Sequence, residues 1–171
     1  MSATSTSTST TSTELADLLS TLATHRGFLR FTVQGLSDEQ ARQTPTASAL
    51  SLGGLIKHVR TVEESWMRFA VGGAELMESV AADWENGFRM LEHETLEGLL
   101  ADYEETAAKT ERLLADLDLD TSYPLPAAPW FEPGASRSVR RVVLHLIAET
   151  SQHAGHADIL RETIDGQKTM G

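Results

Sequence analysis

The chain has 171 residues, of which 40% are hydrophobic and 23% are charged, and its 14 basic against 25 acidic residues give a formal net charge of −11. This is the composition of one globular domain that can bury a core, and the negative charge excludes a general affinity for nucleic-acid phosphates or anionic lipid. The absence of cysteine excludes disulfides, thiolate metal ligands and a cysteine nucleophile, so a thiol used here would arrive as a cofactor.

Residues 1–13, MSATSTSTSTTST, are almost entirely serine and threonine. Such a tract buries too little apolar surface to offset the entropy of ordering it, so we expect a disordered tail. It also lacks the basic and apolar regions of a signal peptide, and no apolar run approaches the about 18 residues that span a membrane. We therefore expect a cytoplasmic protein without a membrane-spanning helix.

Four segments repeat apolar residues with the period of an amphipathic helix. In chain order they run from 14 to 35, from 50 to 70, from 95 to 117, and from 136–138 to 166. A short helical turn capped by Ser37 is expected over residues 36–43, and Gly72-Gly73 is expected to stop the second helix.

Two connections are long. Residues 74–94 predict short helical pieces, and the proline-rich residues 118–136 predict a loop. No segment alternates convincingly between apolar and polar residues, so we predict no strand. Four amphipathic helices in one chain predict an all-α fold, a four-helix bundle with a long connection between its second and third helices.

The fourth helix contains HLIAETSQHAGH, residues 145–156, which holds three histidines and one glutamate. At about 100° per residue, His145, Glu149, His153 and His156 fall within an arc of about 80°, which overlaps the apolar face of the same helix. A carboxylate that faces a core must be paired, hydrogen-bonded, neutralised or bound to a cation. No lysine or arginine lies one turn from Glu149 on this face.

This spacing is typical of metal ligation, because side chains at i and i+4 of one helix can hold the same ion. Glu149 and His153 have that spacing, and the second helix offers His58 on the flank of its apolar stripe. Together they predict a three-ligand site with an open position, as in catalytic zinc sites, although nitrogen and oxygen ligands also suit nickel, iron or manganese. Trp66, two turns after His58, is interpreted as a core residue.

The stretches SLGGLIKHVRTVEESWMRF and RRVVLHLIAETSQHAGHADILRETIDG resemble the DinB superfamily, and more closely an uncharacterised subgroup of mycothiol-producing bacteria. The similarity covers residues 14–168, which we take as the bundle domain. The resemblance implies up-down-down-up topology and a divalent metal held by His58, Glu149 and His153. Glu149 stands where many members have histidine, and the resulting His, Glu, His set is characteristic of mycothiol-dependent maleylpyruvate isomerase. His156 stands where many members have glutamine.

The resemblance implies a thiol-dependent S-transferase or isomerase, in which the metal activates the thiol of mycothiol or another small thiol toward a small electrophile. His145 and His156 are candidates for a supporting shell around the metal ligands. Members of the family are often dimers, so a homodimer is also implied.

Three alternatives remain open at this point. The site could be a non-catalytic, stress-associated metal-binding bundle whose coordination is closed by His145 or His156. It could support metal-assisted hydrolysis with His145 or His156 as the base. It could also hold no metal, with Glu149 hydrogen-bonded to His58 or His145.

Overall fold

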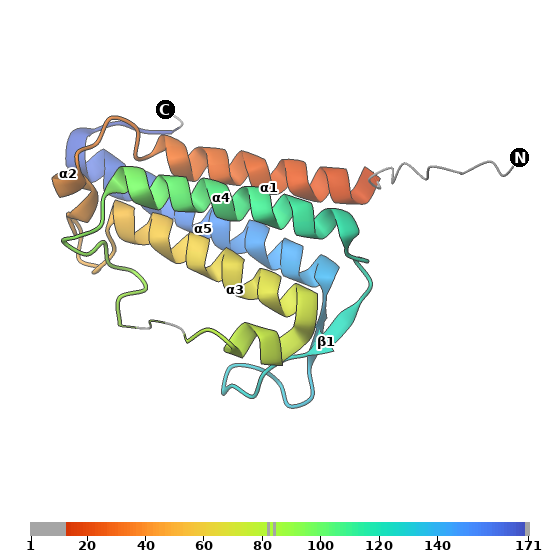
Figure 1. Ribbon diagram of the computed structural model, residues 1–171. Coiled ribbons are helices and arrows are strands. Elements are labelled where there is room, and N and C mark those ends of the chain that lie inside the picture. The colour runs from red at the N-terminus through yellow and green to blue at the C-terminus, as the bar shows by residue number, and fades with distance from the viewer. Residues whose placement is uncertain (1–12, 82, 84, 170–171) are drawn as a thin grey trace, which may run out of the picture.

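The computed structural model describes residues 13–81, 83 and 85–169, and four long helices pack in it as a bundle (Figure 1). The elements are α1 (Thr13–Phe31), α2 (Asp38–Arg42), α3 (Leu52–Glu78), α4 (Leu96–Asp116), β1 (Ser122–Pro124), β2 (Ser136–Ser138) and α5 (Val139–Asp165). The prediction of a four-helix bundle is confirmed. Thr13 begins α1, and the rest of the predicted tail, residues 1–12, lies outside the described residues.

The helices follow the expected up-down-down-up order. In Figure 1, α1 and α5 run in one direction and α3 and α4 run in the other, so the chain must cross the length of the bundle between α3 and α4. α5 packs against both α1 and α3, and α4 packs against α3. The crossover lies beside α3, and this places part of it near the histidine of that helix.

Hydroxyl side chains fix where the helices begin. Ser51, Thr95 and Ser138 precede α3, α4 and α5, and each side chain accepts a hydrogen bond from the backbone N–H three residues later. Ser37 caps α2 in the same way and forms a capping box with Gln40, as the sequence indicates. These caps satisfy N–H groups that have no partner inside the helix.

Helix α3 does not stop at the glycine pair, as the sequence predicted, but bends there and continues to Glu78. Gly72 and Gly73 leave the helical conformation, and Gly73 has a φ of +72°. A Cβ at Gly73 would also lie 3.0 Å from the ring of Tyr123. The glycine therefore serves both a left-handed turn and the close approach of β1.

The prediction that the chain has no strand is wrong. β1 and β2 pair as a short antiparallel ladder, with Tyr123 opposite Arg137. Each strand has only three residues, which is too short for alternation to be seen in the sequence. The pair closes residues 125–135 into a loop and fixes the entry of the chain into α5.

The core has two apolar clusters, separated by a buried polar layer that we define as Arg26, Glu63 and Thr110. Glu63 accepts hydrogen bonds from the Arg26 guanidinium and, at 2.6 Å, from the Thr110 hydroxyl. The layer thus joins α1, α3 and α4 in the middle of the bundle. On α5 the buried Thr150 lies between the two clusters, one residue after Glu149.

Within the described residues, no helix is both long and apolar enough to span a membrane.

Candidate metal centre

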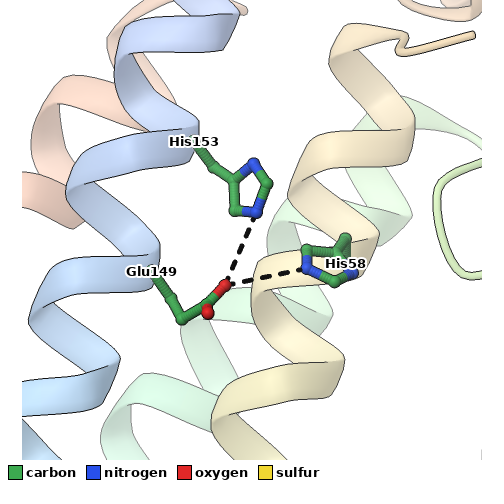
Figure 2. A group of neighbouring side chains, drawn as sticks. All are labelled: His58, Glu149 and His153. Carbon is green, nitrogen blue, oxygen red and sulfur yellow. Dashed lines mark ion pairs between the residues drawn. The ribbon is translucent and has the colours of Figure 1, made fainter. Parts of the chain in front are cut away.

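His58 on α3 and Glu149 and His153 on α5 point toward one another across the interface of the two helices (Figure 2). One potential ligand atom from each residue lies within 4.8 Å of the others. The Glu149 Oε2 atom is 3.5 Å from His153 Nε2 and 4.0 Å from His58 Nε2. The structure therefore brings together the three residues that the sequence singled out.

These separations are too long for hydrogen bonds, for which nitrogen–oxygen distances of about 2.7–3.2 Å are usual. The shortest, 3.5 Å, is close to the separation of about 3.4 Å between ligands that each lie about 2.1 Å from one tetrahedral zinc ion, and the others, up to 4.8 Å, are longer. Among the described residues, the Glu149 carboxylate receives no hydrogen bond, and its ion-pair contacts are to histidines alone. The arrangement has space for a cation between the three side chains.

The electrostatics also favour a cation. Burial, with a smaller contribution from the neighbouring His153, lowers the pKa of His58 to about 4. Burial likewise lowers the pKa of His153, with His156 adding to the effect. Both imidazoles are therefore neutral at pH 7 and present lone pairs, as metal ligation requires. Neutral histidines leave the charge of Glu149 uncompensated, so a divalent ion would restore the balance.

The two further histidines contact different ligands. His156 Nδ1 lies 3.3 Å from His153 Nδ1, on the side of the His153 ring opposite to the nitrogen that faces Glu149. His145 Nε2 lies 3.7 Å from the other Glu149 oxygen, Oε1. Both fall outside the group of three whose ligand atoms lie within 4.8 Å of one another.

Phe88, in the crossover between α3 and α4, is a site residue that the sequence did not single out. Its ring stacks on His58 with a centroid distance of 3.7 Å and an interplanar angle of 19°. The stacking limits rotation of the imidazole and shields one of its faces. The only signal in the sequence was the length of the crossover, because no local period shows which of its side chains returns to the bundle.

Gly54 allows this approach. A Cβ at position 54 would overlap the carbonyl oxygen of Phe88, so the crossover lies directly on the first turn of α3. Lys57, on the next turn, forms an ion pair of 2.7 Å with Glu94 at the end of the crossover. Gly54 is therefore required for the close packing of the segment that covers His58.

Gly54→Ala is expected to destabilise the protein by about 1–3 kcal/mol, because the added methyl group must displace the backbone at Phe88. Urea denaturation followed by circular dichroism measures the change. Gly155→Ala is a matched control, because a Cβ at that helical position meets nothing within 4 Å and alanine favours a helix. A Gly54→Ala variant as stable as the parent would contradict this packing.

Trp66 is buried, as expected of a core residue, but its ring also contacts His145 at a centroid distance of 4.8 Å. Two described cavities lie away from the three candidate ligands. One, of about 290 Å³, lies between α3 and α4, and the other, of about 460 Å³, lies beside the turn that follows α1. The candidate centre is instead open directly to solvent, because the side chains of His58 and Glu149 are 18% and 27% exposed.

Comparison with known proteins places the chain in a family. Residues 17–166 match the model of a family described as mycothiol-S-transferase. No curated protein matches the chain. The match extends from Asp17, in the second turn of α1, to Gly166, which caps α5, and so includes every candidate ligand.

Proposed function

The chain belongs to the mycothiol-S-transferase family, and from this premise we propose that it joins mycothiol, through its sulfur, to a small electrophile at a divalent-metal site. His58, Glu149 and His153 are the proposed ligands. The observation that carries the proposal is the convergence of their ligand atoms, within 4.8 Å, around a carboxylate that has no lysine or arginine partner among the described residues. Zinc fits two imidazoles and one carboxylate best, and nickel, iron and manganese accept the same donors.

The remaining residues support and complete the proposed site. If His153 binds the ion through Nε2, its Nδ1–H can donate to His156 Nδ1 at 3.3 Å, and this bond would fix the tautomer and the ring orientation. Phe88, in the crossover, stacks on the His58 ring of α3 and holds it in place. We assign both residues a positioning role.

A bound divalent cation would lower the pKa of a coordinated thiol and hold the sulfur as a nucleophile. In the proposed transfer, sulfur bonds to an electrophilic carbon, the leaving group departs with the electrons of the broken bond, and the thiol proton passes to a base. His145 Nε2 is the proposed base. Burial is the largest of the effects that lower the pKa of His145, so its imidazole is neutral at pH 7, and Glu149 at 3.7 Å would stabilise the protonated ring.

The proposal is tested by incubating zinc-loaded protein with mycothiol and iodoacetamide and measuring the thioether by mass spectrometry. Because the chain has no cysteine, the protein itself has no thiol to be alkylated. We expect thioether to form faster than without protein, and to fall to the uncatalysed rate in the Glu149→Gln variant.

Two outcomes would favour the alternatives. Equal consumption of an electrophile in thiol-free buffer would indicate metal-assisted hydrolysis. No acceleration by a protein that does hold one metal ion per chain would indicate a non-catalytic metal-binding bundle. Either outcome contradicts the proposed transfer.

A further inference from the structure

Arg137, on β2, reaches the neighbourhood of the candidate metal centre through a series of contacts. Its guanidinium carbon lies 4.6 Å from the centre of the Trp66 ring and 5.4 Å from that of Phe131. The Trp66 ring in turn lies 4.8 Å from His145, which contacts Glu149. Arg137 therefore lies on the Trp66 ring, which in turn contacts His145.

The position of Arg137 is fixed by the strand pair. Tyr123, its partner in the ladder, packs against Phe69 at 6.0 Å and donates a hydrogen bond of 3.2 Å to the carbonyl oxygen of Val71, at the bend of α3. The hairpin is thus attached to the same helix that carries His58. Arg137 therefore lies on a strand whose position is fixed by contacts with α3, and not in a free loop.

The Arg137 guanidinium contacts aromatic rings but has no anionic partner among the described residues. Its side chain forms no ion pair or hydrogen bond there, and its Nη1 atom is buried without an acceptor. Burial, together with the charge of Arg141, lowers the pKa of Arg137. By contrast, Arg140 pairs with Glu14 and Asp120, so acidic residues are available at this end of the bundle. A buried donor left unpaired is costly, and an anion would relieve that cost.

Arg141 adds a second positive charge, one turn before His145. Its side chain has no ion pair among the described residues and is exposed. Arg137 stands behind the Trp66 ring that contacts His145, and Arg141 lies on the same helix as His145. Both positive charges therefore lie on the His145 side of the candidate centre.

We infer that Arg137, assisted by Arg141, forms a carboxylate-binding subsite beside the candidate metal centre, and that the electrophile accepted there carries a carboxylate. The identification of the bound carboxylate compound as an electrophile rests on the proposed function, whereas the subsite itself rests on the two arginines that have no ion-pair partner. A guanidinium in contact with aromatic rings keeps its in-plane N–H donors, which match the two oxygens of a carboxylate. The ring faces of Trp66 and Phe131 would hold that guanidinium in place.

The first test measures binding without chemistry. Full-length protein, in the absence of any thiol, is titrated with benzoate or with the uncharged benzamide while the arginine Nε–H signals are followed by NMR. We expect benzoate to shift the Arg137 signal and to bind more tightly than benzamide. Arg137→Gln should weaken benzoate about 10- to 100-fold, and Arg137→Lys should retain part of the affinity.

Two controls make the result specific. Arg112→Gln removes the same charge from an exposed position on α4 and should leave benzoate binding unchanged. His58→Ala removes a proposed metal ligand, so benzoate binding that survives in it does not depend on coordination to a metal. If benzoate binds no better than benzamide, or binds Arg137→Gln as well as the parent, the inference is overturned.

The second test measures selectivity in the proposed transfer, with mycothiol as the thiol and iodoacetate and iodoacetamide as a matched pair. Rates are corrected for the uncatalysed reaction. Arg137→Gln should lower kcat/KM for iodoacetate about 10- to 100-fold and leave that for iodoacetamide within about twofold. An equal loss for both would indicate a structural role and overturn the inference. If the parent joins mycothiol to neither compound, the proposed function fails. The benzoate titration still tests the subsite by itself.

Discussion

Replacing Glu149 with glutamine is expected to weaken divalent-metal binding by more than about 100-fold. The amide has nearly the same size as the carboxylate but carries no charge, and Glu149 is the only acidic member of the proposed ligand set. Loss of a residue that merely supports a metal ligand costs about 10- to 100-fold, so loss of a charged ligand should exceed that range. The zinc affinity of each protein is measured by competition with a chromophoric chelator.

Glu97→Gln is the matched control, because Glu97 is an exposed carboxylate in the first turn of α4. It changes the net charge of the protein by the same amount and should leave the zinc affinity unchanged. Circular dichroism establishes that both variants are folded. A Glu149→Gln variant that binds zinc within about threefold of the parent would remove Glu149 from the site.

Replacing Glu63 with leucine is expected to lower the free energy of unfolding by about 3–5 kcal/mol. Arg26 is 5% exposed and Glu63 is 1% exposed, so the substitution leaves a buried guanidinium without its main acceptor. It also removes the acceptor of the Thr110 hydroxyl. Urea denaturation in the presence of a chelator measures the change, because a bound metal would add its own stabilisation.

Two further variants identify the cause. The double variant Arg26→Met with Glu63→Leu should recover much of the lost stability, since it removes both buried charges. Glu104→Gln, which breaks the exposed ion pair with Arg30, should cost no more than about 1 kcal/mol. If Glu63→Leu alone costs as little as Glu104→Gln, the polar layer does not hold the bundle together.

The sequence predicted the bundle because helix period and capping are local properties. The starts of α3, α4 and α5 follow from Ser51, Thr95 and Ser138, and the end of α5 follows from Gly166, whose φ is +80°. The convergence of His58, Glu149 and His153 was also predictable, since the i, i+4 spacing places two of them on one face of α5 and His58 flanks the apolar stripe of α3.

The features that were missed depend on contacts between distant segments. The stacking of Phe88 on His58 and the pairing of β1 with β2 join residues about 10 to 30 positions apart, through short segments that have no period of their own. The polar layer, however, had a visible signal. Arg26 lies between Leu22 and Leu29 on the apolar stripe of α1, as Glu63 lies between Val59 and Trp66 on that of α3, and opposite charges within two such stripes predict a buried pair.

The Gly72-Gly73 pair shows how a correct local signal can give a wrong boundary. Glycine favours the end of a helix, and both residues do leave the helical conformation. The chain nevertheless resumes a helix to Glu78, because the left-handed turn at Gly73 redirects it beneath Tyr123. That contact comes from a residue 50 positions later and cannot be read from the local sequence.

The most direct test of the proposed metal centre is elemental analysis of tag-free protein, beside the His58→Ala and His153→Ala variants, after reconstitution with zinc and removal of the excess. We expect about one divalent ion per chain in the parent and almost none in either folded variant, because each removes one of three ligands and the ligands come from two helices. A parent without metal, or variants that keep a full ion, would contradict the proposed centre and the transfer chemistry that depends on it.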